Sequence, residues 1–304
     1  MKKTLILDSN NLLYRIFFMN RARGTDVSTL LVFLRCVRSY VNLIDGADNI
    51  IAVWDSRLCR GQPNFRSQET DTDYKGNRDR EILAGAHDDD DQIQKCIEAI
   101  GGFNMFPNRM EADDVIAWLA HTLTDHELTI VTVDQDMYQL INEKTSVYSP
   151  IKKITINNDN FEQTVGVSKD KFLSYKALMG DKSDNIPGVP KVGKKTALKI
   201  VNTDITEELH KRGDEAIQRY EKNIELMDLS YGYTVHDGEI TAYEQQLEQI
   251  HRLSPDKSQL KSLCIHNAVY AIANDIDNWF SMFESRKTNV PNVVNLINSL
   301  NISK

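Results

Sequence analysis

Nine acidic residues recur along the chain in short groups whose spacing suits a shared site: Asp8, Asp55, Glu111, Asp113, Asp114, Asp134, Asp136, Asp181 and Asp184. Glu111 and Asp114 are three residues apart and share a face if their segment is helical, whereas Asp134 and Asp136 point the same way on an extended backbone. Each acid taken alone is well explained as a turn or helix-start residue. If all nine converge, however, their mutual repulsion requires cations among them.

The ligand type indicates which chemistry such a site would support. Carboxylate oxygens without converging His or Cys favour hard divalent ions, so we predict two Mg²⁺ ions, for which Mn²⁺ can substitute. Two such ions, about 3.5 to 4 Å apart, stabilise the attacking and leaving oxygens in phosphodiester hydrolysis. The acids therefore predict a metal-dependent nuclease.

Three apolar runs would position the first acids, because each run ends in an aspartate: residues 4–8, 50–55 and 128–134. Runs of this length without alternation are typical of parallel strands covered by helices on both faces. Apolar residues at helical spacing lie between the runs, at positions 30, 34, 37, 41 and 44 and at 116, 119, 120 and 123. We predict an α/β fold with a central, mostly parallel sheet flanked by helices, whose ligands bind beyond the carboxyl ends of the strands.

A basic stretch at residues 65–80 places Arg66, Lys75, Arg78 and Arg80 around Tyr74. Such a run is often only a solvated face. In the functional interpretation, Lys75 and Arg78 stabilise the negative charge that develops on the scissile phosphate, and Tyr74 stacks on a base. These three are the candidate catalytic side chains, and Arg66 and Arg80 are candidate DNA contacts.

The stretch GDKSDNIPGVPKVGKKTA at residues 180–197 combines two of the acids with glycines and lysines. It predicts tight turns between a helix that ends near Met179 and one that begins near Lys194. Glycine lets backbone N–H groups approach a phosphate closely, and a helix N-terminus adds a favourable dipole. We expect a grip on the duplex backbone that does not read sequence, formed by Gly188, Lys191, Gly193, Lys194, Lys195 and Thr196.

Composition is compatible with this function. The 304 residues carry a net charge of −8, which argues against a nucleic-acid partner unless the acids are neutralised. Without the nine candidate ligands the charge becomes about +1 (−8 + 9). No stretch reaches the length of a membrane span or a secretory signal, and the four cysteines form no zinc or disulfide pattern. These features predict a cytoplasmic protein without membrane contact, and we expect it to be a monomer.

Six motifs, in this order, resemble the 5′ nuclease or flap endonuclease superfamily, and most of all bacteriophage 5′-3′ exonucleases and the 5′ nuclease domain of bacterial DNA polymerase I. They cover residues 5 to about 200: Leu7-Asp8-Ser9-Asn10, Trp54-Asp55, Tyr74-Lys75-Gly76-Asn77-Arg78, Glu111-Ala112-Asp113-Asp114, segment 134–140 and segment 180–197. Their common order argues against a chance similarity.

The resemblance implies structure-selective cleavage of branched or 5′-flapped DNA, and of RNA/DNA hybrids, near the junction of a 5′ single strand with duplex. It implies one metal group held by Asp8, Asp55, Glu111, Asp113 and Asp114, and a second held by Asp134, Asp136, Asp181 and Asp184. It also implies a helical arch at about 74–107 for the 5′ strand, and a helix-hairpin-helix-type element at 180–200 with a bound K⁺. Expected partners are a replicative polymerase or a single-strand-binding protein.

Two domains are expected, a PIN-like catalytic domain at 1–158 and a helical DNA-binding domain at 159–304. Inside the expected arch, His87 precedes the acidic run 88–91, although a threaded strand would prefer bases there. We interpret the run as an exposed loop or helix start, with a narrower tolerance for substrates as the alternative. For the tail 288–304 we favour a docked terminal helix over a partner-binding segment.

Two rival functions differ from the nuclease in features that the sequence can report. A non-catalytic, structure-specific DNA-binding relative should have lost some of the nine acids, yet all nine are present. A PIN-type ribonuclease should lack the grip at 180–197. We therefore predict an active 5′ nuclease that removes flaps or RNA primers in replication and repair.

Overall fold

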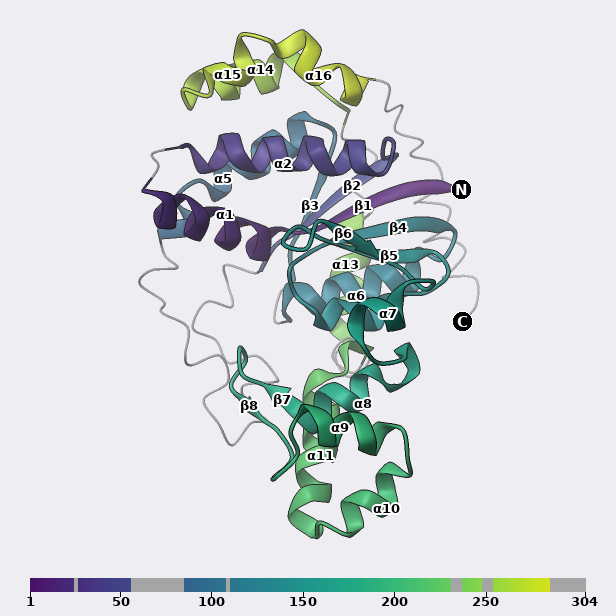
Figure 1. Cartoon of the computed structure of the whole chain (residues 1–304). Coiled ribbons are helices and arrows are strands. Elements are labelled where there is room, and N and C mark those ends of the chain that lie inside the picture. Colours follow the sequence, from purple (N-terminus) through teal and green to yellow (C-terminus); the bar gives the residue numbers. More distant parts are fainter. Residues whose placement is uncertain (25–26, 56–84, 108–109, 231–236, 248–253, 285–304) are drawn as a thin grey trace.

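The computed structural model describes residues 1–24, 27–55, 85–107, 110–230, 237–247 and 254–284 (Figure 1). The basic stretch with Arg66, Tyr74, Lys75, Arg78 and Arg80 lies outside these residues. So do the tail 288–304 and the first part of the expected arch, so the predictions made for them stay predictions.

A six-stranded sheet in the order β3-β2-β1-β4-β5-β6 forms the centre of the molecule. Its strands are Lys2–Asp8 (β1), Asn49–Val53 (β2), Phe103–Met105 (β3), His126–Val131 (β4), Thr145–Ser149 (β5) and Ile154–Ile156 (β6). β1 to β5 are parallel and β6 is antiparallel to β5. Asp8 is in register with Val53, and Leu7 with Val131, so β1, β2 and β4 end at one edge. The predicted mostly parallel sheet is confirmed.

Helices cover both faces of the sheet, which explains the continuous apolar runs (Figure 1). Leu5 and Leu7 pack with α1 (Ser9–Arg23), α2 (Thr29–Leu43) and α5 (Asp90–Ala99). Ile6, between them, faces the opposite layer of α6 (Ala112–Thr122), η2 (Asp136–Leu140) and α7 (Phe161–Val165). Because successive strand side chains point to opposite faces, burial on both sides requires every position to be apolar.

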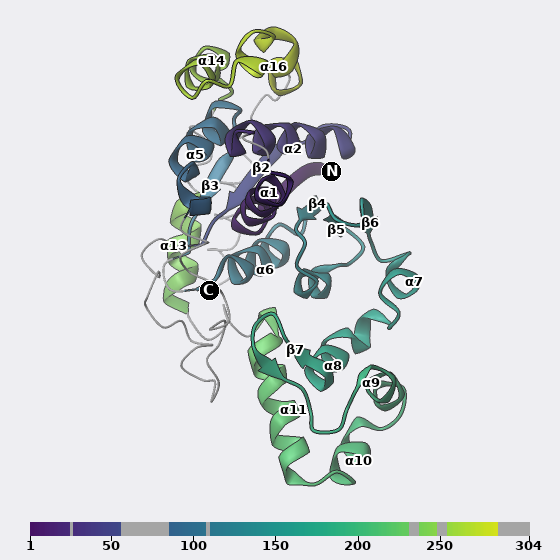
Figure 2. The same ribbon diagram turned by 60° about the vertical axis from the view of Figure 1, so that its left-hand side comes forward.

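A further layer of C-terminal helices lies over α2 and α5 (Figure 2). It consists of α14 (Lys257–His266), α15 (Tyr270–Ala273) and α16 (Ile276–Glu284), and it buries Trp279, Phe280 and Phe283 in the same core as α2. α13 (Asp237–Leu247) instead packs beside α6, where the rings of Tyr243 and Trp118 have centroids 5.4 Å apart.

Residues 85–107 belong to the sheet domain, which corrects the arch range 74–107 from residue 85 onward. After η1 (Gly85–His87), α5 buries Ile93, Cys96 and Ile97, and β3 pairs with β2. Sequence reasoning missed this apolar face, whose residues lie directly after the acidic run 88–91.

The acidic run itself begins a helix, as predicted, but it is not wholly exposed. Asp89 is the N-cap of α5, whereas Asp90 is only 2% exposed. The Asp90 carboxylate lies 2.8 Å from His87 Nδ1, and His87 Nε2 forms a 2.9 Å hydrogen bond with the hydroxyl of Tyr14 on α1. This polar chain joins the start of α5 to α1.

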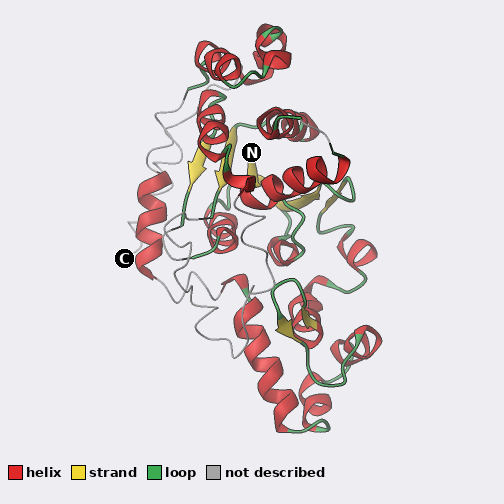
Figure 3. Ribbon diagram, turned by 90° about the vertical axis from the view of Figure 1, so that its left-hand side faces the viewer, coloured by secondary structure: helices red, strands yellow, loops and turns green. Residues whose placement is uncertain are grey.

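The second, helical unit follows the sheet and contains a short two-stranded ribbon (Figure 3). Its elements are α8 (Lys169–Met179), β7 (Gly180–Asp181), β8 (Ile186–Pro187), α9 (Lys194–Val201), α10 (Ile205–His210) and α11 (Asp214–Met227). The predicted helix end at Met179 and helix start at Lys194 are confirmed. Leu178, Val189 and Ile200 share one buried cluster with Ile130 of β4, so the apolar core is continuous between the two units.

Two glycines allow β7 and β8 to approach each other. A Cβ on Gly188 would lie 2.4 Å from the carbonyl oxygen of Met179, and Gly180 has φ +70° with its own Cβ position 2.3 Å from the Gly188 nitrogen. Gly193, by contrast, has nothing within 4 Å of its Cβ position. The ribbon therefore requires glycine at 180 and 188, but not at 193.

We expect Gly188→Ala to lower the free energy of unfolding by about 2 to 3 kcal/mol, because the added methyl must displace backbone. Urea unfolding of the two purified proteins measures the difference. Gly193→Ala is the matched control and should change the value by less than about 1 kcal/mol. Equal losses in the two variants would contradict the close approach of the ribbon strands.

None of the helices in the described ranges combines the length and the apolar character that a membrane crossing requires.

Candidate active site

Three of the predicted acids meet at the carboxyl edge of the sheet. Asp8 is the last residue of β1, Asp55 lies two residues beyond β2, and Asp134 lies three residues beyond β4. Burial raises the pKa of Asp8 from its ordinary 3.8 to about 7; a hydrogen bond from Thr132 opposes this rise, and the charges of Asp134 and Asp55 add to it. Asp8 therefore lies buried among other carboxylates, as the sheet topology predicts.

Polar side chains next to the strand ends fix these acids. Thr132 Oγ1 donates to Asp8 Oδ2 at 2.5 Å and accepts from the backbone N–H of Asp134 at 2.9 Å. In the first turn of α1, Asn10 accepts from the N–H of Asp55 at 2.8 Å, and Asn11 accepts from the N–H of Val133 at 3.0 Å. Sequence reasoning missed the roles of Thr132 and Asn11, although polar residues directly after buried strands were a usable signal.

The acids at the start of α6 join this edge through the backbone. Asp55 Oδ1 accepts a 3.1 Å hydrogen bond from the N–H of Ala112, the first residue of α6. Glu111 and Asp114 form a capping box, in which each side chain accepts from the backbone N–H of the other. Asp114 is fully buried, whereas Glu111 and Asp113 are half-buried. The helix-start role of these acids is thus observed, and their role as metal ligands stays a prediction.

A second group of acids gathers around Lys176 of α8. Its ammonium lies 2.9 Å from Asp136 Oδ1 and 2.5 Å from Asp181 Oδ2. Burial and the charge of Asp134 raise the pKa of Asp136 to about 7, although Lys176 opposes the rise. Asp134 connects the two groups, because its Oδ1 also accepts from the N–H of Asp136 at 2.8 Å. Asp184 lies half-buried in the turn between β7 and β8.

Lys176 is a residue of the candidate site that sequence reasoning missed. Burial lowers its pKa, but the two carboxylates outweigh that effect and raise it above the usual range. Burial raises the pKa of Asp181, yet the hydrogen bonds from Lys176 and Ser183 bring it below its ordinary value. A lysine five positions before Asp181 on a helix was the available signal. Its cation already neutralises part of the charge in the second group.

The chemistry of the donor set fits hard divalent cations. The ligands offered are carboxylates from several elements, and the raised pKa values of Asp8 and Asp136 reflect burial first and neighbouring negative charge second. Within the described ranges, no three His, Cys, Asp or Glu side chains are so placed that they could hold one metal ion together as they stand. The ligand set therefore stays a prediction about the metal-bound state.

The raised pKa values predict how the stability of the metal-free protein depends on pH. Asp8 and Asp136 titrate near 7 when folded but near 3.8 otherwise, so the folded state binds more protons between these values. The free energy of unfolding should therefore fall as pH rises from about 4 to about 7 and level off above that. Urea unfolding at pH 5 and pH 7.5 in EDTA measures this loss. Asp8→Asn should show a smaller loss than the parent protein, and an identical one would contradict the assignment.

The predicted duplex grip lies at the turn that leads into α9. Gly193 is the N-cap of α9, and Lys191, Lys194 and Lys195 are exposed, whereas Gly188 and Thr196 are half-buried. Lys191 has φ +60°, which marks a tight turn before the helix. The lysines and the first N–H groups of α9 thus share one side of the helical unit, and their contact with DNA stays a prediction.

Comparison with known proteins shows relatives that cover between 65% and 94% of the chain. The 5′-3′ exonuclease of Buchnera aphidicola (strain Sg) is 33% identical over 203 residues, which cover 65% of this chain and 69% of the relative. The 5′-3′ exonuclease of Aquifex aeolicus is 27% identical over 301 residues, 94% of this chain and 99% of the relative. Thermostable DNA polymerase I of Thermus filiformis is 29% identical over 209 residues, which span 66% of this chain but only 24% of that polymerase.

A solved structure shows the same fold. The flap endonuclease of bacteriophage T5, in a complex with DNA and metal ions, superposes with a TM-score of 0.59 at 18% identity and covers 92% of this chain and 100% of that one. Residues 167–232 match the family of the 5′-3′ exonuclease C-terminal SAM fold. Residues 3–166 match the 5′-3′ exonuclease N-terminal resolvase-like domain, which is more than half of the chain, and the protein therefore belongs to the 5′-3′ exonuclease family.

Proposed function

We propose that the chain is a structure-selective 5′ nuclease, a 5′-3′ exonuclease and flap endonuclease that depends on Mg²⁺. The observation that carries this proposal is the connected set of acids that begins with Asp8 and Asp134 at the carboxyl edge of the sheet, both bound by Thr132, and continues through Asp136 to Asp181, both bound by Lys176. Membership of the exonuclease family supports the direction of attack, from 5′ to 3′. The substrates proposed are branched or 5′-flapped DNA and RNA/DNA hybrids.

The two proposed ion sites divide the acids between the two groups described above. Asp8, Asp55, Glu111, Asp113 and Asp114 would hold the first ion, and Asp134, Asp136, Asp181 and Asp184 the second. Bound Mg²⁺ or Mn²⁺ would supply Lewis acidity and positive charge for the hydrolysis of a phosphodiester bond by water. Ligand side chains would turn toward the ions on binding.

Two side chains, those of Thr132 and Lys176, hold the candidate metal ligands in position. Thr132 fixes both Asp8 and the backbone of Asp134, so the acids of β1 and β4 keep one relative position. Lys176 holds Asp136 and Asp181 together, although they come from η2 and β7. Such positioning is what metal-assisted hydrolysis demands of a protein, because small displacements of the ligands cost much of the rate.

DNA contacts are proposed on two elements. The N-terminal end of α9, with Lys191, Lys194 and Lys195 exposed, would bind backbone phosphates, and K⁺ would bind at the same turn. Lys75, Arg78 and Tyr74 would contact the scissile phosphate and its base. Arg66 and Arg80 would extend this surface, although all five lie outside the described residues.

The test uses the purified chain with a 5′-flap duplex labelled at either end. We expect cleavage near the junction with Mg²⁺, and no cleavage with EDTA. A blunt duplex without a 5′ single strand, at equal concentration, is the control for structure selectivity. Binding without cleavage in Mg²⁺ or Mn²⁺ would reject the nuclease and favour a DNA-binding relative. Equal cleavage in EDTA would reject the metal assignment alone.

A further inference from the structure

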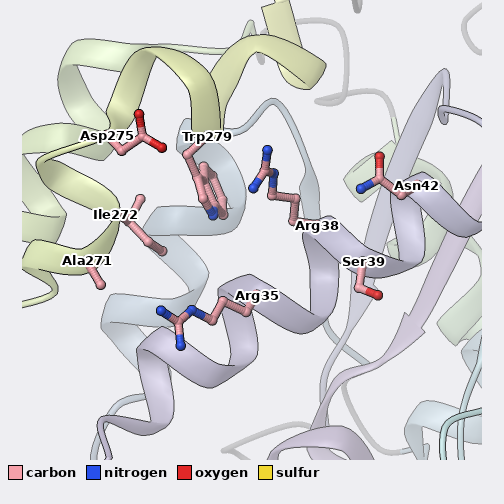
Figure 4. Close-up of a pocket in the computed structure, with 8 residues that line it drawn as sticks. All are labelled: Arg35, Arg38, Ser39, Asn42, Ala271, Ile272, Asp275 and Trp279. Atoms are coloured by element: carbon pink, nitrogen blue, oxygen red, sulfur yellow. The ribbon is translucent and has the colours of Figure 1, made fainter.

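A second polar site lies between α2 and the C-terminal helices α15 and α16. It is a cavity of about 320 Å³, and Figure 4 shows its lining side chains. α2 contributes Arg35, Arg38, Ser39 and Asn42, and the facing wall includes Ile272 and Trp279. Asn42 stands at the end of α2, shortly before β2 begins. The cavity is thus on the outer side of α2, toward the edge opposite the acid cluster.

The cavity contains more hydrogen-bond donors than acceptors. Nε of Arg38 and Nε1 of Trp279 are both buried and have no hydrogen-bond acceptor among the described residues. The guanidinium of Arg38 stacks on the Trp279 ring, 5.9 Å from its centroid, and one of its terminal nitrogens donates to the carbonyl of Asn278 at 3.4 Å. Buried donors without an acceptor are unfavourable, so this pair marks a place where an acceptor is expected.

The charge of the lining favours an anion. Arg35 and Arg38 lie on one face of α2 three residues apart, and Asp275 is the single acid among the described residues that line the cavity. The Asp275 carboxylate already accepts from the Asn278 side chain at 2.9 Å. The lining therefore carries two positive charges against one negative charge, with the neutral groups of Ser39 and Asn42 beside them.

The number of donors favours phosphate over carboxylate. The lining offers N–H and O–H groups from two guanidiniums, an indole, a hydroxyl and an amide, and Figure 4 shows the Arg38 guanidinium beside Trp279. A planar carboxylate offers two oxygens, whereas a phosphate offers three or four in tetrahedral directions. The indole of Trp279 already packs against the Arg38 guanidinium and against the Phe283 ring, whose centroid lies 5.3 Å from its own, so these contacts compete with stacking on a base.

We propose that this cavity binds a phosphate group and thereby ties the C-terminal helices to α2. The group can come from free inorganic phosphate or from the terminal phosphate of a nucleic acid, and both sources present the same oxygens. The inference does not depend on the nuclease assignment, because none of the acids at the sheet edge takes part. Bound phosphate would accept from Arg38 Nε and Trp279 Nε1 together.

The experiment is isothermal titration calorimetry of the full chain in EDTA, at constant ionic strength. Inorganic phosphate is titrated first, followed by a 5′-phosphorylated tetranucleotide and its 5′-hydroxyl counterpart. We expect one saturable phosphate site and a rise in Tm of about 2 to 4 °C at saturation. Binding of inorganic phosphate alone would identify free phosphate as the source, whereas tighter binding of the phosphorylated tetranucleotide would identify a nucleic-acid end.

Matched variants locate the site. Arg38→Gln and the exposed Arg35→Gln should each weaken phosphate binding about tenfold or more, and Trp279→Phe should weaken it while keeping the aromatic packing. Lys95→Gln removes an equal charge from the surface of α5 and should have no effect. No saturable binding, or a loss in Lys194→Gln rather than in Arg35→Gln, would overturn the proposal. Tighter binding of acetate than of phosphate would reject the choice of anion.

Discussion

Asp134→Asn is expected to lower the rate of flap cleavage by at least about 10³-fold, the largest effect of any single change proposed for this chain. The charge of Asp134 adds to the burial that raises the pKa of both Asp8 and Asp136, and its Oδ1 accepts from the backbone N–H of Asp136. Asp134 thus acts on an acid of each predicted metal group. The substitution keeps the size of the side chain but removes its charge.

Single-turnover cleavage of a 5′-flap duplex in saturating Mg²⁺ measures this effect. Asp159→Asn is the matched control, because Asp159 is exposed and lies in the turn before α7. That variant should cleave at the parent rate. A rate for Asp134→Asn within tenfold of the control would remove Asp134 from the centre of the site, even if the chain remains an active nuclease.

Lys176→Met is expected to lower the unfolding free energy of the metal-free protein by about 3 kcal/mol at pH 8. The side chains of Lys176, Asp136 and Asp181 are only 14 or 15% exposed, so the pairing is that of a buried network and not of a surface ion pair. Without the ammonium, two buried carboxylates face each other. At pH 5 the loss should be smaller, because Asp136, with a pKa raised to about 7, can then take up a proton.

Urea unfolding at both pH values, with EDTA and then with Mg²⁺, tests this prediction. Added Mg²⁺ should recover more stability in Lys176→Met than in the parent protein, because a cation replaces the missing ammonium. Lys199→Met, an exposed position on α9, is the control and should change little. A loss that is the same at pH 5 and pH 8 would show that packing, and not charge, explains the effect.

The framework of the site could be predicted from sequence because it depends on local patterns. Uninterrupted apolar runs indicated parallel strands, and the aspartates that end them had to meet at one edge once the strands were parallel. Lys176 could not be found in this way, since its partners come from η2 and β7 and the contact depends on where α8 packs. Asn11 and Thr132 were missed for a related reason, because each contacts a neighbouring strand end: Asn11 accepts from the N–H of Val133, and Thr132 donates to the carboxylate of Asp8.

The helices that pack around the sheet were harder to predict than its strands. Residues 90–105 were included in the arch because the family resemblance implied that range, although Ile93 and Ile97 carry a buried face. The layer α14 to α16 left no clear expectation, because its burial depends on a partner surface on α2 that is distant in sequence. Both cases show tertiary packing deciding what local composition leaves open.

The unbroken core between β4 and α9 has a mechanical consequence. Ile130, Leu178, Val189 and Ile200 lie in one packed cluster, and close-packed interiors resist deformation. We therefore expect the distance between the carboxylates and the exposed lysines of α9 to stay fixed, with no hinge between the two units. If the lysines bind phosphates of the duplex, this fixed distance would place the cleaved bond a constant number of nucleotides from the bound phosphates, whatever the base sequence.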